Sequence, residues 1–124
     1  MTTAPLVSIV IPVFNDEATI SAALESCLAQ TLSEIEVICV DDASTDGTVA
    51  VIERFSARDP RVRLITHERN LSALQSRRTG ILDAAADYIL FLDGDDELAP
   101  DAAEKAVTRA QSSGADLVGF GVTV

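Results

Sequence analysis

The chain has 124 residues, of which 48% are hydrophobic and 23% are charged, and this composition excludes an intrinsically disordered protein. The formal net charge of −11 and the sequence pI of about 4.2 argue against a nucleic-acid partner and against an anionic membrane surface. The length fits one domain with one core. The apolar runs fall far short of the ~18 residues of a membrane span, so we expect no transmembrane segment.

The first half of the chain alternates apolar runs with helical patterns. Residues 7–13 form a Val- and Ile-rich run that predicts a strand, and residues 35–40 predict a second one. Between them, apolar side chains recur at helical spacing, at Ile20, Ala23, Leu24, Cys27 and Leu28. After the second strand, Asp46 or Ser44 can cap a helix whose apolar face consists of Thr48, Val51, Ile52 and Phe55.

The second half continues this alternation. Residues 61–66 predict a strand near a sheet edge because arginines alternate with apolar residues, and residues 88–92 predict a fully apolar strand. A helix is expected to begin near Ser72 and to bury Leu74, Ile81, Leu82 and Ala85. Pro100 suits the first turn of a last helix, which runs through Ala103, Ala106, Val107 and Ala110 and ends at Gly114. Residues 115–124 predict a further strand, so we expect this chain to be the front portion of a longer protein.

This order of elements predicts the α/β class, with a Rossmann-like, mostly parallel sheet and helices on both faces. Crossovers between parallel strands should be right-handed. We expect residues 1–124 to form a single domain. The two cysteines, Cys27 and Cys39, fall in a helical and a strand pattern, which favours buried thiols in a reducing, cytoplasmic compartment over a disulfide or a metal site. The single histidine, His67, is interpreted as a loop residue.

Polar residues follow three of the predicted strands, where ligands of parallel sheets bind. Asn15, Asp16 and Glu17 follow the first strand, residues 41–47 follow the second, and residues 93–97 follow the fourth. Repulsion among so many carboxylates favours a divalent cation at this edge, which would also let an acidic protein hold an anionic ligand.

The sequence Asp93-Gly94-Asp95 is the most specific polar feature. Two carboxylates separated by a glycine, directly after a buried strand, can lie on one side of a tight turn. Their hard oxygen atoms suit Mg²⁺ or Mn²⁺, completed by water and phosphate. The alternative is an acidic turn in which Asp95 or Asp96 caps the next helix.

Other polar and aromatic residues leave two interpretations open. Either one of Asp41 and Asp42 caps a helix while the other is solvated, or Asp42 accepts a hydrogen bond from a base or ribose. Phe14 either stacks on a base or packs in the core. Of Arg77 and Arg78, we expect one to face solvent and the other either to reach the acidic cleft and neutralise it or to bind a diphosphate. Asp46 is interpreted as a cap or turn residue rather than a ligand.

Three stretches together carry a family resemblance. VSIVIPVFNDEATISAALESCLAQTL, IEVICVDDASTDGT and YILFLDGDDELAP occur in this order and closely resemble the nucleotide-binding half of family 2 glycosyltransferases, which have the GT-A fold. The match runs from Val7 to about Pro100. It implies transfer of a sugar from a nucleoside diphosphate sugar, usually a UDP-sugar, to a hydroxyl acceptor with inversion, using Mg²⁺ or Mn²⁺.

The resemblance also implies roles for individual residues. Pro12, Phe14 and Asp42 are similar to the wall around the base, with Asp42 accepting from it. Asp93 resembles the ribose or metal-side contact, and Asp95 resembles the ligand of the metal that bridges the two phosphates. Arg77 matches an arginine that lies near the nucleotide in the family.

The chain departs from the family pattern in three respects. Asn70 is followed by Leu71 and Ser72 where the family often has Asn-x-Gly, and Arg78 follows Arg77 where the family often has asparagine. The third is that the family has an acceptor half, which supplies the general base, and we expect neither within these residues.

The sequence leaves two rival functions open. A non-catalytic module that only binds the nucleotide sugar is the main alternative. A phosphoacceptor receiver-like domain is a weaker alternative. It predicts an acidic pair after the first strand and a lysine after the last, whereas here Phe14, Asn15 and Asp16 follow the first strand and no lysine follows the fifth.

Overall fold

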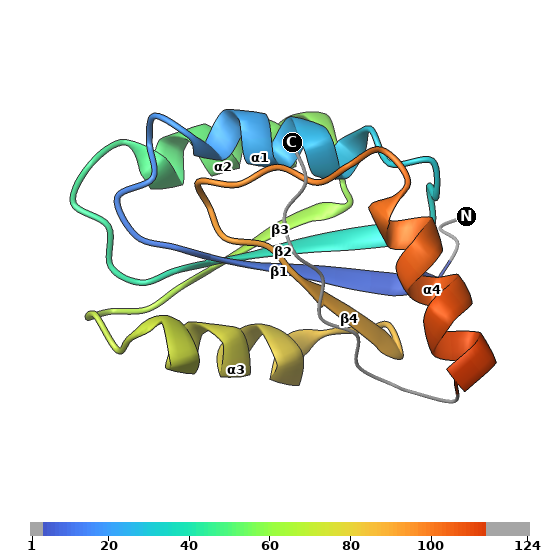
Figure 1. The fold of residues 1–124 in the computed structure, drawn as a ribbon. Coiled ribbons are helices and arrows are strands. Elements are labelled where there is room, and N and C mark those ends of the chain that lie inside the picture. The colour runs from blue at the N-terminus through green and yellow to red at the C-terminus, as the bar shows by residue number, and fades with distance from the viewer. Residues whose placement is uncertain (1–3, 114–124) are drawn as a thin grey trace.

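The computed structural model describes residues 4–113, which form one four-stranded parallel sheet with helices on both faces (Figure 1). In chain order the elements are β1 (Val7–Val13), α1 (Ile20–Leu28), β2 (Ile35–Asp41), α2 (Thr48–Arg58), β3 (Val62–Thr66), α3 (Ala73–Asp83), β4 (Tyr88–Phe91) and α4 (Ala102–Ser113). The predicted α/β class and all eight elements within the described range are confirmed. The strand expected at 115–124 lies outside the described residues.

The sheet order is β3-β2-β1-β4, and each neighbouring pair is parallel. β3 therefore lies at an edge, as the alternation of Arg61 and Arg63 with apolar residues predicts. The register pairs Val13 with Asp41 and Asp41 with Thr66, so the carboxyl ends of β1, β2 and β3 lie side by side at the same end of the sheet. The loops that follow these strands are thereby brought together.

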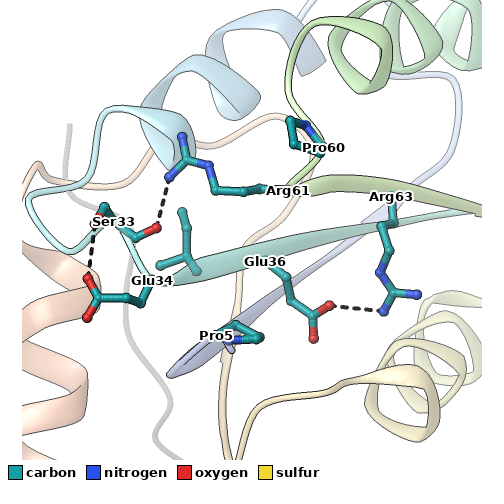
Figure 2. A pocket seen from close by; sticks show the side chains of 8 residues that line it. Pro5, Ser33, Glu34, Glu36, Pro60, Arg61 and Arg63 are labelled. Carbon is teal, nitrogen blue, oxygen red and sulfur yellow. Dashed lines mark hydrogen bonds and ion pairs between the residues drawn. The ribbon is translucent and has the colours of Figure 1, made fainter. Parts of the chain in front are cut away.

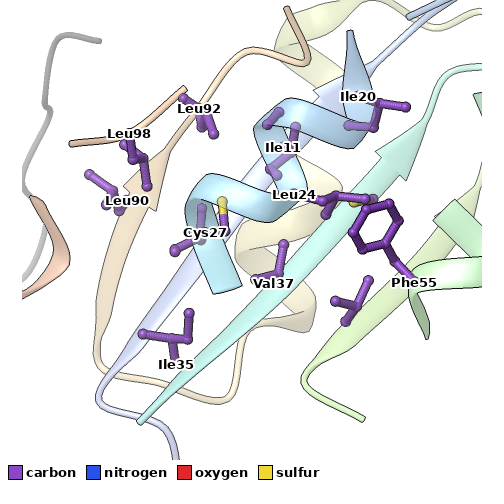
Figure 3. Packing of buried hydrophobic residues seen from close by; sticks show 14 of the residues in the cluster. Ile11, Ile20, Leu24, Cys27, Ile35, Val37, Phe55, Leu90, Leu92 and Leu98 are labelled. Atoms are coloured by element: carbon purple, nitrogen blue, oxygen red, sulfur yellow. The ribbon is translucent and has the colours of Figure 1, made fainter. Parts of the chain in front are cut away.

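The main core lies between the sheet and the helices α1 and α2 (Figure 3). Side chains of a strand alternate between its two faces, and the odd-numbered residues of β1 join this cluster. From α1 it includes Ile20, Leu24 and Cys27, and from α2 it includes Phe55. The expected apolar faces of α1, α2 and α4 are all buried except Leu28, which is half-buried.

Both cysteines are free and fully buried. Burial raises the pKa of the Cys27 thiol to about 12 and raises that of Cys39 as well, so neither is a reactive thiolate at neutral pH. The expectation of two buried structural thiols is confirmed.

The opposite face of the sheet is covered by α3, and here the sequence prediction is wrong. Leu74 and Leu82 are 71% and 75% exposed, and Ile81 and Ala85 are exposed as well. The buried side of α3 consists of Ser76 and Gly80. A Cβ atom at Gly80 would overlap the side chain of Val10 on β1. The helix thus approaches the strand closely through small residues, which leaves its large apolar side chains outside.

Candidate nucleotide and metal site

A hollow of about 450 Å³ lies at the carboxyl ends of the strands. Pro12, Phe14, Asp42, Asp93 and Asp95 all line it, as do Asp16, Asn70, Ser72 and Ser76. Five of the six residues predicted for the site therefore lie around one cavity, and the sixth, Arg77, reaches Asp93 with 3.3 Å between Nη2 and Oδ1. Arg78 is exposed, so the expectation that one of the two arginines reaches the acidic turn is confirmed.

Phe14 is the first residue after β1, and 46% of its surface is exposed. Its alternative role in the core is therefore excluded, and its ring is free to stack on a flat ligand.

Asp42 is the most heavily hydrogen-bonded carboxylate of the cavity. Its Oδ1 accepts from the Leu71 N–H at 2.8 Å and lies 2.9 Å from Nδ1 of His67, and its Oδ2 accepts from the Ser72 N–H at 3.0 Å. Burial alone would raise the pKa of Asp42, but these hydrogen bonds outweigh it and hold the pKa below the ordinary value. Asp42 is ionised at neutral pH and neither caps a helix nor faces bulk solvent.

His67 was missed as a site residue by sequence reasoning. It lies in the loop after β3, as expected, but its ring is bonded to Asp42 on one side and to Thr79 of α3 on the other. A signal existed in the sequence, because a parallel register that pairs β2 with β3 places the residue after β3 beside the residue after β2.

The loops after β1 and β2 are joined by reciprocal hydrogen bonds. The Asn15 N–H donates to Ser44, the Thr45 N–H donates to the Asn15 side chain, and the Gly47 N–H donates to Glu17. Several polar residues that follow these strands thus hold the two loops together.

Asp46 has a similar structural role. Its carboxylate accepts from the N–H groups of Thr48 and Glu17 at 2.9 and 3.3 Å. Gly47 is the N-cap residue of α2, so Asp46 is the turn residue of the two interpretations and not the cap. Ser44 does not cap the helix either, because it bonds Asp41.

The turn after β4 concentrates negative charge. Asp93, Asp95 and Asp96 each present a carboxylate oxygen, and these atoms lie within 4.8 Å of one another. Six residues separate Asp95 from the start of α4, so neither Asp95 nor Asp96 caps that helix. Such a set of hard oxygen donors fits Mg²⁺ or Mn²⁺, with water and phosphate as the remaining ligands.

Asp16 is a neighbour of this turn that sequence reasoning did not single out. A Cβ atom at Gly94 would overlap the Asp16 carboxylate, so Gly94 is needed here for the close approach of a side chain. Burial raises the pKa of Asp16, and the charges of Asp95, Asp46 and Asp93 raise it further. The Thr19 hydroxyl donates to the Gly94 carbonyl at 2.9 Å and fixes the turn to the start of α1.

A larger hollow of about 570 Å³ lies at the opposite end of the strands (Figure 2). Its two arginines have partners: Arg63 forms an ion pair with Glu36 at 3.1 Å, and Arg61 donates to the Ser33 carbonyl at 3.1 Å. Glu36 also accepts from Ser8 and from the Ala85 N–H. These bonds hold the connection between α3 and β4 in place. The predicted site residues line the other hollow, at the carboxyl ends of the strands.

The parallel sheet, the hollow beyond its strand ends and the acidic turn define an α/β domain of the GT-A type. Comparison with known proteins identifies the family: residues 8–124 match the model of glycosyl transferase family 2, and the chain belongs to that family. This confirms the resemblance seen in the sequence.

Individual relatives agree with this assignment. The chain is 39% identical over 117 residues to an uncharacterized glycosyltransferase, EpsJ, of Bacillus subtilis, covering 94% of this chain and 34% of the relative. It is 40% identical over 113 residues to the succinoglycan biosynthesis protein ExoO of Rhizobium meliloti, covering 91% and 32%. The chain thus spans about a third of the length of these relatives.

Two solved structures share the fold. TarS residues 1–349 of S. aureus, in complex with UDP-GlcNAc, has a TM-score of 0.78 and 27% identity, covering 86% of this chain and 31% of that one. The mannosyltransferase PcManGT of Pyrobaculum calidifontis, in complex with GDP-Man and Mn²⁺, has a TM-score of 0.79 and 25% identity, covering 88% and 33%. Within residues 4–113, no helix is long and apolar enough to cross a membrane.

Proposed function

We propose that residues 1–124 form the donor-binding domain of a glycosyltransferase that uses a nucleoside diphosphate sugar and a divalent cation. The observation that carries this proposal is the single hollow that joins an exposed aromatic ring, a buried ionised carboxylate and an acidic turn. Phe14 would stack on the base, Asp42 would accept from it, and Pro12 would complete the wall. The structures of TarS with UDP-GlcNAc and of PcManGT with GDP-Man and Mn²⁺ support the proposal.

Asp93 and Asp95 would hold Mg²⁺ or Mn²⁺, which supplies positive charge beside the diphosphate as the bond to the sugar breaks. Asp93 would also lie near the ribose. Arg77, which contacts Asp93, would interact with the diphosphate from α3. In transfer with inversion, the acceptor oxygen attacks the anomeric carbon opposite the diphosphate and loses its proton to a base. We assign that base to none of the described residues.

The hydrogen bonds of Asp42 favour uracil as the base. A carboxylate has about four lone-pair sites, and three are taken by His67, Leu71 and Ser72. One site remains, on Oδ2. Uracil presents a single N–H donor on its pairing edge, whereas guanine presents two adjacent donors that need two acceptors. A UDP-sugar therefore fits this carboxylate better than a GDP-sugar.

Calorimetric titration of the chain with UDP, GDP and CDP in the presence of Mn²⁺ tests the proposal. UDP should bind at least tenfold more tightly than GDP. A chain that binds none of the three nucleotides would refute the donor-binding function. Tighter binding of GDP than of UDP would refute the assignment of uracil.

The main alternative is that the 124-residue chain binds the donor and does not transfer the sugar. It is favoured by the share of the relatives that the chain spans, about a third. A positioned base contributes about 10²–10⁴-fold, and alignment of the acceptor contributes more, so their absence would abolish transfer. Incubation with a UDP-sugar and a panel of acceptors should give slow donor hydrolysis at most. A glycoside product would place the base within this chain, with Asp96 and Glu97 the first residues to replace.

A further inference from the structure

His67 occupies a bridging position between the cavity and α3. Its ring lies 2.9 Å from Asp42 through Nδ1 and 2.9 Å from the Thr79 hydroxyl through Nε2. The side chains of His67 and Asp42 are only 9% and 6% exposed. Neither His67 nor Thr79 lines the hollow, so an effect of either on a ligand there must act through Asp42.

The protons of this chain of bonds can be placed by counting. Asp42 is ionised and can only accept, so Nδ1 of His67 carries a proton and donates it. The single Thr79 proton is shared between two acceptors, Nε2 at 2.9 Å and the Gln75 carbonyl at 3.0 Å. Whichever acceptor Thr79 serves, one lone pair of Asp42 is filled from Nδ1.

This filled lone pair limits how many donors of a base Asp42 can accept. With His67 and Leu71 on Oδ1 and Ser72 on Oδ2, the carboxylate is held in one orientation with a single free acceptor site. Without the His67 bond, Oδ1 regains a lone pair and the carboxylate is freer to turn about χ2, which is a soft torsion. Both oxygens could then face two adjacent donors of a base.

We propose that His67, held in place by Thr79, is a positioning residue that sets the base preference of the site by limiting Asp42 to one free acceptor. This proposal rests on the proposed function, because it concerns the base of the same donor nucleotide. It assigns specificity to a residue that never touches the ligand.

Four variants test it by calorimetry with UDP and GDP in the presence of Mn²⁺. His67→Leu removes both ring bonds and should lower the preference for UDP over GDP about tenfold, the size of one hydrogen bond to a charged group. His67→Asn should retain most of the preference, because an asparagine N–H can replace Nδ1. Thr79→Val releases Nε2 only and should lower the preference about threefold. Thr108→Val, on the exposed side of α4, is the matched control and should change nothing.

The outcomes separate the two proposals. If wild type binds UDP but the UDP-to-GDP ratio stays constant in His67→Leu and Thr79→Val, the positioning role is refuted and the donor site stands. Equal weakening of both nucleotides also refutes it, because that indicates a purely structural histidine. If wild type binds no nucleotide, the proposed function fails and the inference with it.

A second measurement does not depend on the folding of any variant. His67 is the single histidine of the chain, so its ring nitrogens give one pair of ¹⁵N signals. Addition of UDP should shift the Nδ1 signal, because the base draws on the same carboxylate, whereas inorganic diphosphate should leave it in place. If the Nδ1 signal does not shift at saturating UDP, the proposal is overturned.

Discussion

Replacement of Ser72 by glycine should stabilise the protein, although it removes a side chain. Ser72 has φ 107° and ψ 161°, a region that is populated almost solely by glycine, and a side chain there costs about 1–3 kcal/mol. Against this gain, the Ser72 hydroxyl accepts from the Gln75 N–H at 3.3 Å and caps α3. Exchange of such a cap for glycine costs only a few tenths of a kcal/mol. The greater freedom of glycine in the unfolded chain costs about 0.4–1 kcal/mol.

The net expectation for Ser72→Gly is about 1 kcal/mol of added stability, or roughly 4 °C in Tm for a domain of this size. Ser72→Ala is the matched control, because it keeps the strain and loses the cap, and should cost about 1 kcal/mol. Urea unfolding followed by circular dichroism gives both free energies. If Ser72→Gly is no more stable than wild type, then the backbone at this residue is not strained and the reasoning is wrong.

Three further predictions concern stability and the site. Gly80→Ala should destabilise the chain by about 1–2 kcal/mol in urea unfolding, because the overlap with Val10 outweighs the gain in helix propensity; a neutral result would mean that α3 does not pack this closely. Asp42→Asn should cost about 1–3 kcal/mol at pH 7, since the amide cannot accept all three present bonds. The pKa of Asp42 is below its ordinary 3.8, so its stabilising effect is present above that pH and is lost as the pH falls through the lower, folded-state pKa. The stability gap between wild type and Asp42→Asn should therefore close below about pH 4 in acid unfolding, and a gap that widens would contradict the sign.

The strands and three of the four helices could be predicted because their apolar residues follow the spacing of the element that buries them. α3 begins where Ser72 predicts it, yet its buried face could not be found by hydrophobicity. Its contact with β1 is made by Ser76 and Gly80, and small residues give no signal in an apolar pattern. The position of the site could be predicted for a different reason, since parallel strands bring their carboxyl ends to one edge whatever the loops contain.

Which polar residues line the hollow and which bind a neighbouring loop could be predicted only in part. Asn15, Glu17 and Asp46 follow strands just as Asp42 and Asp95 do, but they bind the neighbouring loop. Their partners lie 29 or 30 residues away in the chain, so the pairing depends on the exact geometry of two loops. His67 was missed for the same reason, because its partner Asp42 lies 25 residues away.

The carboxylates of the site differ in what compensates their negative charge, and we expect them to differ in their need for a metal ion. Asp42 accepts bonds from two backbone N–H groups and from His67, so it is preorganised without any cation. In the turn of Asp93, Asp95 and Asp96, Asp93 forms an ion pair with Arg77. The two side chains are 58% and 38% exposed, so this pair offsets little of the negative charge of the turn. A diphosphate should therefore need Mn²⁺ to approach the turn, whereas a bare nucleoside should not.

Titration with uridine and with UDP, each with Mn²⁺ or with excess chelator, measures this directly. Chelator should abolish UDP binding and leave the affinity for uridine within about twofold of its value with Mn²⁺, because the base contacts are complete without metal. Asp95→Asn should reproduce the effect of chelator on UDP alone, while Asp42→Asn should weaken both ligands, since it alters the acceptor that the base needs. Uridine binding that also requires Mn²⁺ would show that the cation organises the whole cavity, and that the hydrogen bonds around Asp42 do not suffice.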